Sequence, residues 1–222
     1  MTETIVFLTG GPYHPVSDQA DLIQEWLGDG FRVVKCDGLA AFEALQGCDL
    51  FVAAGVHWTG SPSLGYLYRP MEARHQQAFV DYIASGRPVL GLHGGIASYD
   101  DWPEFGRLLG FRWDWQVTAH TPESRWPVKI ADRGHPVVAG AGDYEVQDEL
   151  YYNVQVTPGL DFRVHAWAEY HEVRFPMVMT GQGGRLPGAG KTAYLANGHS
   201  LAAFDPPAIS TIWRNTVKWL LT

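Results

Sequence analysis

Hydrophobic and polar positions in the first half of the chain follow two different periods. Short apolar runs that predict strands occupy residues 4–8, 31–36, 50–54 and 88–92. Two stretches between them, residues 17–27 and 72–85, carry apolar side chains at helical spacing and end at glycines. Strands that alternate with amphipathic helices are typical of βαβ units, so this half predicts a parallel sheet.

The second half has a less regular pattern. A helical stretch from Ile96 to Leu109 follows the fourth strand, and a last helix is expected to begin at Pro206-Pro207 and to pack back onto the sheet. Strand-like runs occupy residues 126–131, 143–152, 162–168, 176–180 and 192–196. We expect some of these runs to extend the sheet in antiparallel fashion. Because there is no internal repeat and no convincing linker, we expect a single α/β domain over residues 1–222.

Composition narrows the range of partners. The 222 residues carry 24 acidic and 16 basic side chains, a formal charge of −8, and show no Lys/Arg runs. This balance argues against nucleic acid and anionic membranes as partners. No apolar stretch approaches the ~20 residues that span a bilayer, and the N-terminus lacks a signal-peptide pattern, so we expect a cytoplasmic protein. Two cysteines, Cys36 and Cys48, are too few for a disulfide framework or a zinc ribbon.

One turn stands out as a candidate reactive centre. The run Gly91-Leu92-His93-Gly94-Gly95 follows the fourth predicted strand and precedes a helical stretch. Glycines on both sides of His93 permit the tight strand-to-helix turn known as a nucleophile elbow, which exposes its central side chain.

Four of the nine histidines follow predicted strands: His14, His57, His93 and His199. In an open parallel sheet, ligands bind outside the carboxyl ends of the strands, where the loops converge. The four histidines are therefore expected at the same edge and indicate a site there. His75, in a helix, and His165, in a strand, are interpreted as structural.

Aromatic and acidic residues accompany these histidines. The same loops contain Tyr13, Trp58, Tyr66, Tyr68, Tyr99, Trp102, Trp113 and Trp115. Flat apolar faces beside polar groups suit a sugar ring, although each aromatic side chain could equally shield loop backbone. Asp148 and Glu149 are adjacent, and in a strand they would point to opposite faces, so we expect one of them, Glu149 slightly ahead of Asp148, to enter the site.

Several motifs together resemble the ThuA-like (trehalose utilisation) proteins. They are the 91–95 run, Ser98-Tyr99-Asp100-Asp101-Trp102-Pro103-Glu104-Phe105, His135-Pro136, Asp148-Glu149-Leu150-Tyr151 and Gly198-His199. The resemblance implies a flavodoxin-like three-layer fold of the class I glutamine amidotransferase-like superfamily. It also implies a role in disaccharide uptake or catabolism, acting on a 3-keto sugar that a partner dehydrogenase supplies.

The sequence departs from the amidotransferase pattern at the elbow. Those enzymes place a cysteine there as the nucleophile, whereas this chain has His93. His199 could correspond to the superfamily's catalytic histidine, but position 201 is Leu rather than an acidic residue. We therefore do not expect glutamine hydrolysis.

Two chemistries and one non-catalytic reading remain open. In the first, His93, His199 and Glu149 perform acid–base catalysis as a lyase or hydrolase of a keto-glycoside. In the second, His and Glu side chains hold a divalent metal ion, although no local metal-binding spacing is present. The alternative is a non-catalytic sugar-binding or assembly module, and a homodimer is compatible with the aromatic surplus. Residues expected to contact substrate are Gly11, His14, His57, Trp58, Tyr99, Trp102, Asp148 and Tyr151.

Overall fold

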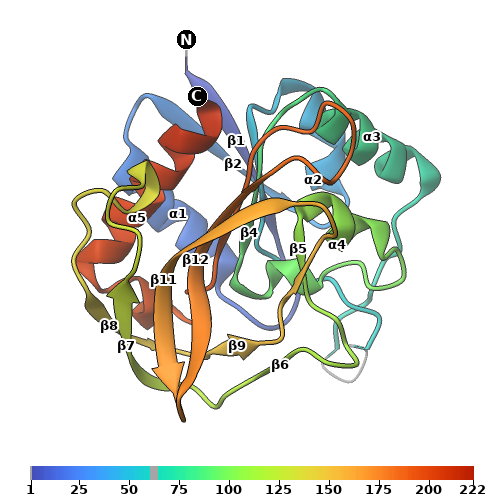
Figure 1. Ribbon diagram of the computed structural model, residues 1–222. Coiled ribbons are helices and arrows are strands. Elements are labelled where there is room, and N and C mark those ends of the chain that lie inside the picture. Colours follow the sequence, from blue (N-terminus) through green and yellow to red (C-terminus); the bar gives the residue numbers. More distant parts are fainter. Residues whose placement is uncertain (1, 61–64) are drawn as a thin grey trace.

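A nine-stranded mixed sheet runs through the protein (Figure 1). The computed structural model describes residues 2–60 and 65–222. Five strands form the parallel half, in the spatial order β2 (Phe31–Asp37), β1 (Glu3–Thr9), β3 (Leu50–Ala53), β4 (Val89–Leu92) and β13 (Thr192–Leu195). The antiparallel half continues with β12 (Val173–Gln182), β11 (Asp161–Tyr170), β7 (Ser124–Ile130) and β8 (Tyr144–Asp148). The predicted α/β class, a parallel sheet with an antiparallel extension, is confirmed.

Helices cover both faces of the parallel half and make three layers (Figure 1). On one face lie α1 (Val16–Leu27) and α5 (Pro207–Leu221); on the other lie α2 (Ala40–Glu43), α3 (Ala73–Ala84) and α4 (Glu104–Leu109). The apolar stripe of α5 is buried, and its Trp213 ring stacks 6.3 Å from the Phe7 ring of β1. Each such large side chain stabilises the fold by about 1.5–3 kcal/mol. No helix of the described residues is long and apolar enough to cross a bilayer.

Short 3₁₀ helices and two small ladders lie in the segments that connect the main strands and helices. The 3₁₀ helices are η1 (Leu45–Gly47), η3 (His93–Ala97), η4 (Pro136–Val138) and η5 (Leu201–Phe204). Two small ladders pair β5 (Phe111–Arg112) with β10 (Gln155–Val156) and β6 (Ala119–His120) with β9 (Tyr151–Tyr152). These ladders hold the segment after α4 against the segment after β8.

Two sequence predictions about element bounds are wrong. The helix expected over 96–109 is instead η3 followed by α4, because Tyr99 adopts a left-handed conformation (φ 54°) and Pro103 disfavours helix at the residue before it. The strand expected over 143–152 ends at Asp148, and β9 pairs elsewhere. Glu149 therefore lies just beyond the strand, where strand alternation no longer dictates that it and Asp148 point to opposite faces.

His165, in β11 of the antiparallel half, is the centre of a polar cluster. Its Nδ1 donates to Asp132 Oδ2 at 3.2 Å, and its Nε2 accepts from Thr180 Oγ1 at 2.8 Å. The His135 ring stacks on it with centroids 4.0 Å apart. Burial and then repulsion from His135 and Arg163 lower the pKa of His165 from 6.5 to about 4, although the hydrogen bond and charge of Asp132 oppose the shift.

This lowered pKa predicts a loss of stability in mild acid. The unfolded chain binds a proton at His165 more readily than the folded chain does. The contribution of neutral His165 to the free energy of unfolding is therefore complete above pH 6.5 and is lost as the pH falls toward 4. Between pH 7 and pH 5 it amounts to at most about 2 kcal/mol. Urea unfolding of the wild type and of His165→Gln should therefore show a flatter pH dependence in the variant. Parallel pH profiles would contradict the assignment.

Candidate functional site

His93 occupies a strained turn directly after β4. Its backbone has φ 43°, in the left-handed region that few residues with side chains adopt. A Cβ at Gly95 would lie 2.0 Å from the carbonyl oxygen of Ala53, so only glycine permits this close approach. The elbow pattern predicts an exposed side chain, but the His93 ring is buried because it donates from Nδ1 to the Ala196 carbonyl at 2.6 Å and accepts at Nε2 from the Tyr151 hydroxyl at 2.8 Å. Both ring nitrogens are therefore oriented by the fold.

Asp148 ties the end of β8 to the loop after β13. Its carboxylate is fully buried and accepts four hydrogen bonds. Oδ1 accepts from the backbone N–H of Glu149 (2.8 Å) and of His199 (3.2 Å). Oδ2 accepts from the Gly198 N–H (2.9 Å) and from Asn197 Nδ2 (3.2 Å). Burial raises the pKa of Asp148, although His93 and these donors oppose the rise, and the carboxylate positions the loop rather than facing the cavity.

Glu149 lies at the centre of three imidazoles. Its Oε1 is 3.1 Å from His120 Nδ1, and its Oε2 is 3.3 Å from His199 Nδ1 and 3.7 Å from His93 Nε2. Burial raises the pKa of Glu149, but the histidines more than offset it, so the pKa lies below its usual value. An ionised carboxylate beside imidazoles is a group that can accept a proton.

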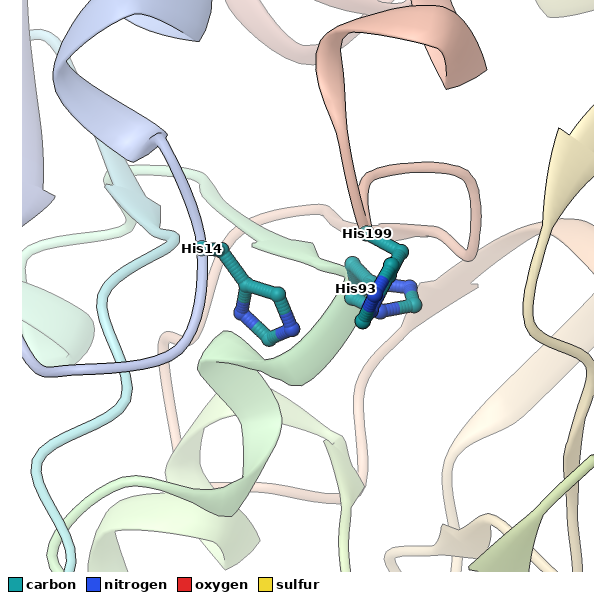
Figure 2. Close-up of side chains that lie close together, drawn as sticks. All are labelled: His14, His93 and His199. Atoms are coloured by element: carbon teal, nitrogen blue, oxygen red, sulfur yellow. The ribbon is translucent and has the colours of Figure 1, made fainter. Parts of the chain in front are cut away.

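His14 completes a cluster with His93 and His199 (Figure 2). Its ring centroid lies 4.8 Å from that of His93 and 5.4 Å from that of His199. Burial, then repulsion from the neighbouring histidines, lowers the pKa of His14 to about 2, so its imidazole is neutral. Among the described residues, the three histidines offer one ligand atom each, and these atoms lie within 4.8 Å of one another. They are the residues that could hold a metal ion.

A cavity of about 300 Å³ opens in front of this cluster. It is lined by Tyr13, His14, Val56, Trp58, Gly94, Ala97, Trp113, Trp115, His120, Glu149, Tyr151 and His199. The Trp58 and Trp115 rings stack face to face, with centroids 4.0 Å apart and planes 9° from parallel. One wall is therefore aromatic, while imidazoles and a carboxylate supply the polar groups.

Five residues expected to contact substrate lie outside the cavity lining: Asp148, described above, and Gly11, His57, Tyr99 and Trp102. His57 donates from Nε2 to the Thr9 carbonyl (2.8 Å), accepts at Nδ1 from the Tyr66 hydroxyl, and stacks on the buried Tyr99 ring. Trp102 packs against the core. At Gly11 a Cβ would come within 2.2 Å of the Val56 carbonyl oxygen, so this glycine allows two loops to meet. These residues support the loops at the edge of the sheet and do not line the cavity.

Sequence reasoning named Trp113 and Trp115 among the aromatic candidates but missed His120. His120 follows no strand of the parallel sheet; the two-residue pairing of β6 with β9 brings it beside Glu149. A two-residue ladder leaves no recognisable pattern in the sequence. The cysteines stay outside the site: burial raises the pKa of both thiols, that of Cys48 to about 11, so neither is a ready nucleophile.

Fold and site together define a three-layer α/β protein of the flavodoxin-like, amidotransferase-like type, with a histidine at its elbow. The sequence model of the ThuA family, described as "Trehalose utilisation", matches residues 4–220, and the chain belongs to this family. A comparison with curated proteins gives no match.

Solved structures share the fold at low identity. A protein from Parabacteroides merdae described as ThuA-like superposes with a TM-score of 0.76 and 16% identity, covering 100% of this chain and 91% of that one. A second, from Bacteroides uniformis, gives 0.71 and 18%, with 99% and 91% covered. The protein STM3548 from Salmonella typhimurium gives 0.62 and 14%, with 99% and 98% covered. At these identities the likeness concerns the fold.

The hydrogen bonds of Asp148 predict a large loss of stability in Asp148→Asn. An amide would turn an NH₂ group toward some of the four N–H donors, which leaves buried donors unpaired and costs about 2–4 kcal/mol. Glu145→Gln is the matched control, because Glu145 lies in the same strand and its side chain is 60% exposed. Chemical denaturation should place the control within about 0.5 kcal/mol of wild type. Equal stability of the two variants would contradict the role of Asp148.

Proposed function

We propose that the protein is an enzyme of disaccharide catabolism that acts on a disaccharide or its 3-keto derivative by elimination, hydration or hydrolysis. The observation that carries the proposal is that Glu149 and His199 line one aromatic-walled cavity, with the buried His93 ring 3.7 Å from Glu149 directly behind them. Family membership supports the substrate class. A dehydrogenase of the same route would supply the keto sugar, because nothing among these side chains oxidises a hydroxyl group.

The side chains suit proton transfer next to a carbonyl. A carbonyl at C3 of a sugar acidifies the hydrogen at C2, and removal of that proton lets the C1–O glycosidic bond break with a double bond forming between C1 and C2. The leaving oxygen takes up a proton, and addition of water to the double bond completes a net hydrolysis. Glu149 is the ionised group that accepts the proton, and the imidazoles beside it supply a proton donor.

The aromatic wall supports a sugar as substrate. The stacked Trp58–Trp115 pair, with Trp113 next to Trp115 at 5.6 Å between centroids, presents flat apolar surface beside polar groups. The C–H face of a pyranose packs on such a surface while its hydroxyls bond to the polar side. A glutamine side chain has no ring face to pack on this wall. Its hydrolysis would also require a cysteine at the elbow, where this chain has His93.

Loss of the reactive groups should abolish turnover. In Glu149→Gln and His93→Ala, turnover of a 3-keto-disaccharide should fall by about 10²-fold or more, because each variant removes a group that acts on protons or orients the cluster. His171→Asn is the control, since His171 lies in the turn between β11 and β12. Product formation is followed by chromatography, and thermal midpoints are recorded alongside. Wild-type turnover in both site variants would contradict the proposal.

The aromatic wall makes a separate prediction. Trp115 is 42% exposed, so Trp115→Ala should leave folding intact. It should raise KM for the disaccharide about tenfold with a smaller change in kcat, because it removes a stacking surface worth about 1–1.5 kcal/mol. Steady-state kinetics of the two proteins decide the point; an unchanged KM would remove Trp115 from the binding surface.

The competing function is a non-catalytic sugar-binding or assembly module on the same fold. It is favoured by the absence of the superfamily's cysteine from the elbow. Calorimetry with disaccharides and 3-keto-disaccharides separates the two. Saturable binding with no product after long incubation at high protein concentration, with added Mn²⁺ or Zn²⁺, would support the module and exclude the enzyme.

A further inference from the structure

We infer that His14, His93 and His199 form a binding site for a divalent transition-metal ion such as Zn²⁺ or Mn²⁺. The inference deepens the proposed function and rests on it only for the identity of the substrate. Imidazole is a preferred ligand of Zn²⁺, and three histidines that leave one position open are typical of catalytic rather than structural zinc centres.

The three ligands come from three separate loops at the same edge of the sheet. His14 follows β1, His93 follows β4 and His199 follows β13 (Figure 2). Their ligand atoms lie within 4.8 Å of one another. Around a tetrahedral ion with metal–nitrogen distances of ~2.0–2.1 Å, such atoms lie about 3.3 Å apart, so modest side-chain rotations close the site. Because the ligands are far apart in the sequence, no local motif announces them.

The orientation of His93 is that of a metal ligand. Its Nδ1 hydrogen is held by the Ala196 carbonyl at 2.6 Å, so Nε2 is the ring nitrogen whose lone pair could coordinate a cation. A backbone carbonyl or carboxylate on the second ring nitrogen is the usual partner of metal-binding histidines. In this structure the Tyr151 hydroxyl donates to Nε2 at 2.8 Å, so it caps the lone pair that a cation would take. Binding would release this hydroxyl toward the cavity.

His199 carries an unsatisfied nitrogen. Its Nδ1 is buried and makes no hydrogen bond among the described residues, although Glu149 Oε2 lies 3.3 Å away. A buried polar atom without a partner costs about 1–3 kcal/mol. A bound cation would remove this cost, either at Nδ1 itself or by turning the ring so that Nδ1–H meets Glu149 and Nε2 meets the ion.

Glycine backbones hold the rings in place. A Cβ at Gly94 would lie 2.6 Å from His14 Cε1, and one at Gly198 would lie 2.7 Å from His93 Cβ. The His14 ring and the base of the His93 side chain therefore pack directly against main chain, which limits them to modest rotations. The carboxylate of Glu149 at 3.3–3.7 Å from two of the rings adds a negative charge that favours a cation.

In the proposed reaction, the metal ion and Glu149 would have different roles. A cation held by the three imidazoles would polarise the sugar carbonyl or a water molecule, and Glu149, beside the ligands, would transfer the proton. The open position would face the cavity, since His14 and His199 both line it.

Metal content tests the inference directly. Full-length protein is stripped with a chelator, titrated with Zn²⁺ and Mn²⁺ by calorimetry, and analysed by mass spectrometry after dialysis. We expect about one ion per chain for at least one of the metals. His14→Ala and His199→Ala should lose at least 100-fold in affinity, whereas His120→Gln, which changes a neighbouring cavity histidine outside the cluster, should retain the stoichiometry.

A second variant keeps the test sharp where an alanine variant folds poorly. Tyr151→Phe retains all three ligands and removes the hydroxyl that caps His93 Nε2, so it should bind the ion as tightly as wild type or several-fold more tightly. Absence of stoichiometric binding in wild type, or equal binding in folded His14→Ala, overturns the inference. Turnover of a keto-disaccharide by metal-free protein would leave the proposed function standing without the metal. Stoichiometric metal binding without turnover of a keto-disaccharide would support the metal site and contradict the proposed function.

Discussion

The buried carboxylate of Asp148 is the interaction on which the site depends. It joins the end of β8, in the antiparallel half of the sheet, to residues 197–199, which follow β13 in the parallel half. Through these hydrogen bonds the position of His199 is coupled to that of Glu149, the residue after Asp148. A charge in a fully buried position is tolerated only because four donors surround it, and that requirement also fixes the loop geometry.

The elbow at His93 combines a strained backbone turn with a side chain that is not a cysteine. Glycines on either side allow a left-handed residue at the end of β4, and the turn places a side chain at the edge of the sheet. With an imidazole in that position, a thioester is out of reach, but a ring held by Ala196 and Tyr151 is well placed to act with its neighbours. The proposed carbonyl chemistry on a sugar uses this backbone without the cysteine that amide hydrolysis requires.

The cavity places a polar cluster of histidines and Glu149 opposite an apolar wall of tryptophans. Three neighbouring imidazoles would repel one another if protonated, and burial together with this repulsion keeps His14 neutral. Glu149, in contrast, stays ionised because histidines surround it. Opposite the polar groups, stacked tryptophans supply apolar surface. A ligand with one apolar face and several hydroxyls matches both sides at once.

Much of this arrangement follows from the sequence. Apolar periodicity predicted the alternating strands and helices, and the rule that ligands bind at the carboxyl ends of parallel strands selected His14, His93 and His199, which the structure brings together. The same rule selected His57, whose ring instead turns to the Thr9 carbonyl and Tyr66, because the rule locates a loop but not the direction of a side chain.

Only the tertiary structure decided the rest. The end of β8 at Asp148 freed Glu149 from strand alternation, and a two-residue ladder carried His120 to it. Such contacts join residues tens of positions apart through single hydrogen bonds, so no periodicity records them. The sequence by itself determined the strands of the parallel half and the edge of the sheet at which their loops meet, since the strands follow from local apolar pattern. The orientation of each imidazole was decided by packing and by the need to satisfy buried polar groups.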